Sequence, residues 1–183
     1  MYFNNIIMYF NNIIIFFNKT LNKIKPFINL EIPFTDYNCL SIFVYLFYNM
    51  NYNYDLYNLH AIIACNSYSI LITFHLALIF DIDVFKRMQE KMNITPLKFH
   101  LGNIILHVYP CYYLYMYPPI NISYYHSIIS SFSYILWLYF YSDDKLSLNK
   151  IYVPLKTYQW FILHNIFIIT SLLTPYTFKK FII

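Results

Sequence analysis

The sequence predicts an all-α integral membrane protein, a helical bundle of about five transmembrane helices within a range of four to six. Of its 183 residues, 60% are apolar and only 11% are charged, whereas charged residues make up about 25% of an average soluble domain. Several apolar runs reach the roughly 20 residues that a helix needs to cross a bilayer. The lysines and arginines lie mostly between these runs, as a membrane topology requires.

Glycine and cysteine are both scarce, and this limits the classes of function. Gly102 is the single glycine, which excludes the glycine-rich phosphate loops of nucleotide-binding proteins. The three cysteines, Cys39, Cys65 and Cys111, all fall within predicted helices. An odd number in such positions indicates neither a disulfide framework nor a paired zinc knuckle. We therefore expect the cysteines to be small buried packing residues.

The N-terminal segment differs from the rest of the chain. Residues 1–17 contain the heptapeptide MYFNNII twice, and this spacing places the asparagines on one side of a helix and Ile, Phe and Met on the other. Such a pattern is typical of a helix that lies in the membrane interface. Residues 18–36 are basic and contain two prolines, so we expect residues 1–36 to form an interfacial helix and a linker. If residues 1–17 also crossed the membrane, they would add a sixth span.

Residues 37–183 are expected to form the multi-pass bundle. The apolar runs that predict its five spans cover residues 37–54, 57–80, 97–119, 120–141 and 152–174. Pro110 lies inside the third run and should bend that helix, because proline leaves the carbonyl of Leu106 without its amide partner. The Pro118–Pro119 pair ends the same helix. The connection to the fourth run is short, which predicts antiparallel neighbours.

The basic residues predict the orientation of the bundle. Lys and Arg number three in residues 18–36, four in residues 81–98 and two in residues 142–150. With five spans, these three segments lie on one side of the membrane, and positively charged loops are typically cytoplasmic. Lys179 and Lys180, near the C-terminal end, are the exception.

Histidines and hydroxyl side chains recur at helical spacing in the last three spans. In a straight α-helix, His100, His107 and Cys111 fall within about 40° of one another. His126 and Ser130 share a side of the fourth span, and His164 and Ser171 share a side of the fifth. Because lipid cannot hydrogen-bond these groups, the three polar lines should face one another. The resulting prediction is a polar seam of five residues: His100, Asn103, His107, His126 and His164.

Two pairs of side chains suggest intramembrane catalysis. His107 and Cys111, like His126 and Ser130, are four residues apart and can meet on one side of a helix as a base and a nucleophile. Pairs of this kind are found in lipid acyl-transferases and hydrolases. They leave open the alternative that the chain is a lipid-modifying enzyme, with His107, Cys111, His126 and Ser130 as its candidate catalytic residues.

A metal site is the other chemical interpretation of the histidines. The candidate ligands are His100, His107, His126 and His164, since imidazole is a common metal ligand. However, His100 and His107 are about 10.5 Å apart along a helix, and the HExxH motif is absent. A haem would require a second histidine pair and glycines against the porphyrin. We therefore expect no cofactor.

The interpretation we favour treats the histidines and hydroxyls as hydrogen bonds between helices. It predicts a membrane scaffold or a small-solute transport component, with the lipid bilayer and either other membrane proteins or a second copy as partners. Nucleic acid is not expected, because the lysines are spread over several loops. The excess of Asn, Ile, Tyr and Phe is typical of AT-biased coding, and in this composition the chain resembles uncharacterised multi-pass membrane proteins of AT-rich giant viruses.

Overall fold

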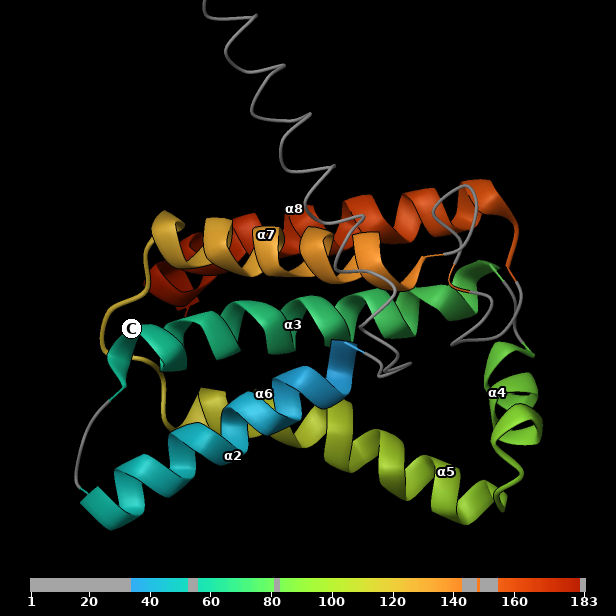
Figure 1. Cartoon of the computed structure of the whole chain (residues 1–183), viewed down its shortest axis with the longest axis horizontal. Coiled ribbons are helices and arrows are strands. Elements are labelled where there is room, and N and C mark those ends of the chain that lie inside the picture. Colours follow the sequence, from blue (N-terminus) through green and yellow to red (C-terminus); the bar gives the residue numbers. More distant parts are fainter. Residues whose placement is uncertain (1–33, 53–55, 81–82, 143–147, 149–154, 182–183) are drawn as a thin grey trace, which may run out of the picture. The chain divides into compact units, whose positions relative to one another are not determined.

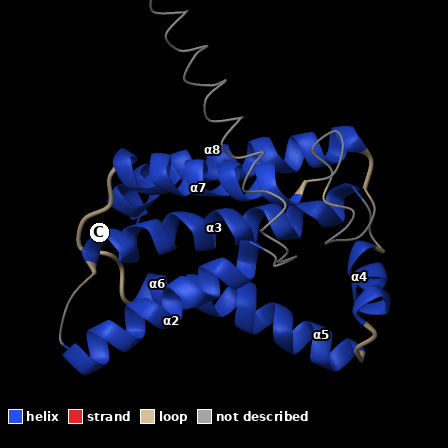
Figure 2. Cartoon of the chain, viewed as in Figure 1, coloured by secondary structure: helices blue, strands red, loops and turns tan. Residues whose placement is uncertain are grey.

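A computed structural model describes residues 34–52, 56–80, 83–142, 148 and 155–181, and every regular element in them is a helix (Figure 1, Figure 2). The chain divides into two units, Met1–Glu31 and Ile32–Ile183, and all the described residues belong to the second. The described part of the chain confirms the all-α prediction. The predicted interfacial helix over residues 1–17, and the linker as far as residue 33, lie outside the described residues.

The helices follow the apolar runs of the sequence. In chain order they are α2 (Phe34–Tyr52), α3 (Tyr57–Phe80), α4 (Val84–Met92), α5 (Pro96–Asn103), the π-helical turn η2 (Ile104–Val108), α6 (Tyr109–Met116), α7 (Tyr124–Tyr141) and α8 (Thr157–Phe181). The polar stretch after the second run becomes the short helix α4. The start of α5 shows how side chains fix the end of a helix. The Thr95 side chain accepts a hydrogen bond from the Lys98 amide, with Pro96 in the first turn of α5.

α3 is the helix around which the others pack. It contacts α8, α7, α2 and α6, and Figure 1 shows it between the α7–α8 pair and α2 with α6. The contacts use small side chains, since Ala61, Ala64, Cys65 and Ser69 of α3 are all fully buried. Small residues let helix backbones approach closely, which is the usual way for helices to associate in lipid.

Successive long helices run in opposite directions. α3 runs toward α4, the α5–α6 segment returns, α7 runs toward the α4 end again, and α8 returns (Figure 1). The turn over residues 117–123 therefore lies at the end of the bundle opposite α4. The arrangement agrees with antiparallel neighbours joined by short connections.

Two described helices are long and apolar enough to cross a membrane, Tyr57–Ala77 within α3 and Thr157–Phe178 within α8. The prediction of about five such helices is therefore not confirmed. α2 and α7 are rich in tyrosine, which lowers their hydropathy. The predicted third span, residues 97–119, is divided into α5, η2 and α6. These three helical stretches do not reach the length and hydropathy of α3 and α8.

Candidate functional site

A cavity of about 90 Å³, partly open at the surface, lies where α2, α3, η2, α7 and α8 come together, and α4 also contributes to its lining. Most of the lining is apolar. Its aromatic members are Phe34, Phe74, Tyr134, Trp137, Trp160 and Phe167. None of the described side chains that line the cavity carries a charge. The cavity is formed by parts of the chain that are distant in sequence, and it is the best-formed candidate site of the described residues.

Stacked rings hold one wall of the cavity. Tyr134 of α7 and Phe167 of α8 stack with their ring centroids 3.8 Å apart. The ring of Phe34, in the first turn of α2, points edge-on at both, with centroid distances of 5.2 and 5.5 Å. Offset and edge-on arrangements are the favourable ones for aromatic pairs. Three helices are thereby joined by one aromatic cluster, which fixes the shape of this wall.

The cavity lining also contains polar side chains. His107 and Thr73, both in the lining, are called its polar end here. The imidazole of His107 is only 7% exposed and stacks on Phe74, with the ring centroids 4.0 Å apart. Nδ1 of His107 and Oγ1 of Thr73 are both buried without a hydrogen-bond partner. A buried polar atom left without a partner costs about 1–3 kcal/mol. Both residues line the cavity, so the cost of these two unpartnered atoms falls beside it.

The π-helical turn sets the position of His107. The amide of Tyr109 donates to the carbonyl of Ile104, five residues earlier, and Pro110 follows directly. Proline has no amide hydrogen, and its ring clashes with the carbonyl four residues before it, so a wider turn relieves the conflict. Figure 1 shows the bend between α5 and α6 at this point. π-helical turns within α-helices are frequent at functional sites.

The same turn separates residues that the sequence places in one line. A π-helical turn holds one residue more than an α-helical turn, which rotates the preceding residues by about 100°. His107 and Cys111 are buried as a result, whereas His100 is exposed and Asn103 is half-buried. The predicted stripe of His100, His107 and Cys111 assumes an undistorted α-helix, and the structure does not have one here.

The other predicted seam residues each bind a different partner. Nε2 of His126 lies 2.9 Å from the side-chain oxygen of Asn58, and its Nδ1 accepts from the Ser123 amide at 3.1 Å. Nδ1 of His164 lies 2.8 Å from the hydroxyl of Tyr134. These contacts join α7 to α3 and α8 to α7. The structure therefore does not bring His100, Asn103, His107, His126 and His164 into one seam.

The candidate catalytic pairs are not joined by hydrogen bonds in the described structure. Ser130 donates to the side-chain oxygen of Asn66 at 2.6 Å instead of meeting His126. Cys111 is buried, with its backbone carbonyl accepting from Tyr68 at 3.3 Å. Among the described residues, no three His, Cys, Asp or Glu side chains gather where they could hold a metal ion. The candidate ligands His100, His107, His126 and His164 accordingly stand apart.

A network of small polar side chains at the centre of the bundle was missed by the sequence analysis. Ser171 of α8 donates to Ser130 of α7 at 2.9 Å, and Ser130 in turn donates to Asn66 of α3. Cys65 Sγ lies 3.6 Å from the Ser127 hydroxyl. Ser130 and Ser171 are recognisable from their helical spacing. Asn66 could have been found from its position among the small residues of α3.

Thr73 was also missed, and the sequence carries no signal for it. A threonine within an apolar helix ordinarily hydrogen-bonds to its own backbone, as Thr170 and Thr174 do in α8. Only the structure shows that the hydroxyl of Thr73 lacks such a bond.

The histidines can be tested as structural groups by comparing His126→Ala with His100→Ala. His126→Ala removes the bond to the Ser123 amide at the start of α7 and the bond to Asn58 of α3. A lost cap costs about 1 kcal/mol and an interhelical hydrogen bond in lipid about 0.6 kcal/mol. The midpoint of thermal unfolding in detergent should fall for His126→Ala. His100→Ala should leave the midpoint unchanged because His100 is exposed, and equal effects of the two changes would contradict this assignment.

Comparison of the chain with protein-family models, characterised proteins and solved structures gives no match.

Proposed function

We propose that the chain is a multi-pass integral membrane protein that serves as a membrane scaffold or small-solute transport component. The observation that carries this proposal is that polar side chains are fully buried while large apolar ones are exposed. Ser69, Ser127 and Ser130 are 0% exposed, whereas Met50 is 83% exposed and Ile79 is 74% exposed. Water would favour the opposite distribution. Hydrocarbon chains solvate exposed apolar side chains and leave polar groups to find partners inside the protein.

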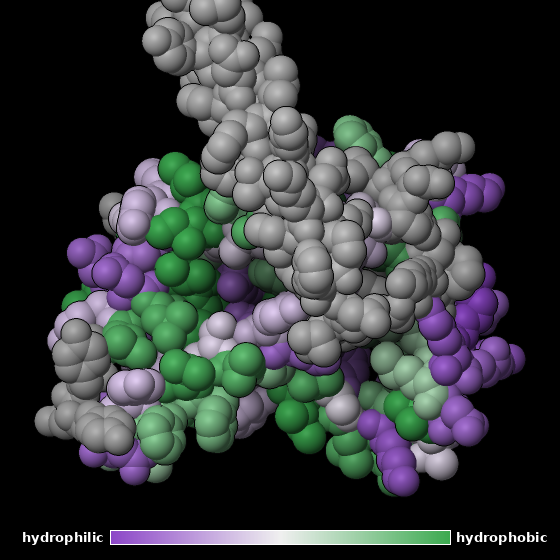
Figure 3. All heavy atoms as spheres, viewed as in Figure 1, coloured by the Kyte–Doolittle hydropathy of each residue, from purple (hydrophilic) through white to green (hydrophobic). Residues whose placement is uncertain are grey.

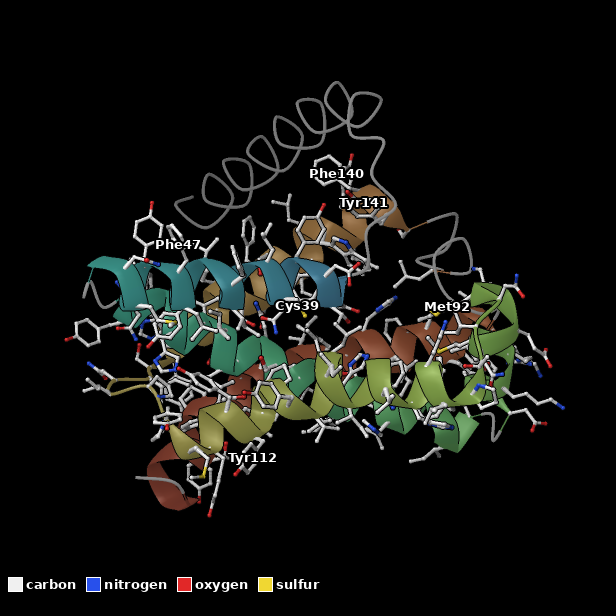
Figure 4. The ribbon with its side chains drawn as sticks, turned by 90° about the horizontal axis from the view of Figure 1, so that it is seen from below. Cys39, Phe47, Met92, Tyr112, Phe140 and Tyr141 are labelled. Carbon is white, nitrogen blue, oxygen red and sulfur yellow. The ribbon has the colours of Figure 1, made fainter. Side chains whose placement is uncertain are left out.

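The exposed apolar residues lie on several helices. Phe47 of α2 and Tyr112 of α6 point away from the bundle (Figure 4), with exposed fractions of 45% and 58%. In Figure 3 hydrophobic residues are prominent over α2, interspersed with hydrophilic ones, and hydrophilic residues gather around α4. Large exposed apolar surfaces mark contacts with membranes or other proteins. The number of helices involved favours a surrounding solvent of lipid.

Helix length supports five crossings, although hydropathy singles out two. α2 and α7 contain 19 and 18 residues, which corresponds to about 28 and 27 Å. The continuous helical stretch from Pro96 to Met116 extends about 31 Å. Each is close to the 30 Å of a typical hydrocarbon core. Tyrosine contributes an aromatic body with a polar tip, so tyrosine-rich helices suit a membrane better than their hydropathy suggests.

The position of the charges supports an orientation. Lys86, Arg87 and Lys91 belong to α4, at the end of the bundle opposite the turn over residues 117–123 (Figure 1). α7 contains no charged residue. We infer that the α4 end faces the cytoplasm, the side that the sequence predicts for residues 81–98 and 142–150.

The enzymatic alternative has no specific observation in its favour. Neither His107 with Cys111 nor His126 with Ser130 forms a hydrogen bond in the described structure, and Ser130 is already engaged by Asn66 and Ser171. The small-solute role is supported by the cavity, because its polar end offers hydrogen bonds to a guest.

Cysteine accessibility tests the multi-pass topology. In a background with Cys39, Cys65 and Cys111 replaced by alanine, single cysteines would be introduced as Glu90→Cys and Asn121→Cys, two exposed positions at opposite ends of the bundle. A membrane-impermeant maleimide should label Asn121→Cys in intact cells. It should label Glu90→Cys only after the membrane is permeabilised.

Extraction provides the control for this topology experiment. The chain should stay in the membrane pellet in alkaline carbonate, which removes peripheral proteins. Labelling of both cysteines from the same side, or release of the chain by carbonate, would overturn the proposal.

A further inference from the structure

We propose that the cavity beside His107 binds a small uncharged alcohol, with its apolar body among the aromatic rings and its hydroxyl between Nδ1 of His107 and Oγ1 of Thr73. The inference rests on the small-solute role proposed above and names the chemical class of the solute. Its central observation is that His107, more than nine-tenths buried, lines the cavity with an unpartnered nitrogen.

The size of the cavity limits the ligand. An apolar cavity of 150 Å³ holds benzene or xenon, and this cavity measures about 90 Å³. A guest somewhat smaller than benzene fits without displacing the aromatic wall. Stacking between Tyr134 and Phe167, and of Phe34 against both, makes that wall costly to move. A short aliphatic alcohol of the size of ethanol meets this limit.

The polar end selects a hydroxyl group. A neutral imidazole carries one hydrogen on its two nitrogens, so Nδ1 of His107 is either a donor or an acceptor. A ligand hydroxyl serves both cases, because it donates to a bare Nδ1 while accepting from Thr73, or accepts from a protonated Nδ1 while donating to Thr73. A carbonyl or ether oxygen can only accept. A hydroxyl is therefore the group that satisfies both orphaned atoms whichever tautomer is present.

Charge excludes other classes of ligand. The described lining contains no Asp, Glu, Lys or Arg, so an ammonium or carboxylate ligand would lose its hydration without gaining a counterion. A hydrocarbon would fill the apolar part but leave Nδ1 of His107 and Oγ1 of Thr73 without partners. An uncharged ligand with a single hydroxyl is the class that matches both parts of the cavity.

The imidazole nitrogens provide the test. The full chain, labelled with ¹⁵N in its six histidines and placed in lipid nanodiscs, would be titrated with ethanol. We expect a saturable change in the ¹⁵N resonances of His107 and no change in those of the other five histidines. Propane, in which a methyl group replaces the hydroxyl, should leave the His107 resonances unchanged. The resonance of His107 is assigned by its loss in His107→Phe.

Two variants and a matched control identify the contacts. Thr73→Val keeps the shape of the side chain and should weaken ethanol binding about tenfold. Ala77→Leu fills the cavity from its α3 side and should abolish binding. Thr170→Val should leave the affinity unchanged, because the Thr170 hydroxyl bonds to the backbone of its own helix, away from the cavity lining.

Three results would overturn the inference: a linear change in all six histidines, which indicates partitioning into the lipid; a saturable change that survives Ala77→Leu; or equal weakening by Thr73→Val and Thr170→Val. The titration reports on the ligand, whereas cysteine accessibility reports on membrane crossing. Either proposal can therefore fail while the other stands.

Discussion

Phe167→Ala should lower the free energy of unfolding of the bundle by about 3 kcal/mol, the lower end of the range for truncating a buried phenylalanine. Phe167 is 2% exposed, and its ring stacks on Tyr134 and receives the edge of Phe34. The lower end applies under the proposal that lipid surrounds the bundle, because lipid is about as apolar as the bundle interior. The loss therefore comes from packing rather than from transfer out of water. Unfolding by sodium dodecyl sulfate in mixed micelles gives this free energy.

Phe161→Ala is the matched control for this change. It makes the same truncation in the same helix, α8, at a position that is 58% exposed. We expect it to change the free energy of unfolding by no more than about 0.5 kcal/mol. Equal losses for the two variants would contradict the packing described for the α7–α8 pair.

Benzene gives a second measurement on Phe167→Ala. Removing the ring enlarges the cavity that Phe167 lines, and enlarged apolar cavities bind benzene. A ligand that binds only the folded state stabilises it by mass action, so benzene should restore part of the lost stability. The unmodified chain and Phe161→Ala should show no such rescue. Absence of rescue in Phe167→Ala would mean that the neighbouring helices had collapsed into the space.

The helices themselves could be predicted because composition and proline placement determine them. The apolar run over residues 57–80 matches α3 (Tyr57–Phe80), and the run over 120–141 matches α7 (Tyr124–Tyr141) within a few residues. Long apolar runs of this kind predict helices, because an α-helix satisfies the backbone polar groups within a single segment. Pro110 likewise predicts a distortion, and η2 lies directly before it.

The arrangement of the helices could not be predicted in the same way. The stretch 97–119 carries the most conspicuous polar side chains, yet α3 is the helix on which the others pack. In water an apolar stripe identifies the buried side of a helix. α3 has no such stripe, because its polar and apolar residues are distributed around the helix. Its sequence therefore does not indicate which residues face neighbouring helices.

The candidate site was predicted in part. His107 was among the predicted residues and does line the cavity, but its partners in the lining come from other helices. Thr73 and Phe74 belong to α3, while Tyr134 and Phe167 belong to α7 and α8. Helical periodicity relates residues within one element and carries no information on such contacts. It also assumes a constant rotation per residue, which the π-helical turn at Ile104–Val108 violates.

The second large effect is expected for Ser130→Val, at about 2–6 kcal/mol of lost stability. The Ser130 hydroxyl donates to Asn66 at 2.6 Å, receives a bond from Ser171 at 2.9 Å, and is 0% exposed. Valine leaves Asn66 and Ser171 without these bonds, at about 1–3 kcal/mol, and adds bulk to a filled space, at about 1–3 kcal/mol. Unfolding in mixed micelles measures the sum, and Ser130→Ala measures the hydrogen-bond part alone.

Ser133→Val is the control for Ser130→Val, because the Ser133 hydroxyl bonds only to a carbonyl of its own helix at 2.8 Å and is half-buried. We expect it to cost well under half as much. If Ser130→Ala were neutral, the buried network would be incidental to stability. A loss confined to Ser130 would mean that polar contacts between α3, α7 and α8 select this packing in lipid, where apolar surfaces alone do not distinguish one helix neighbour from another.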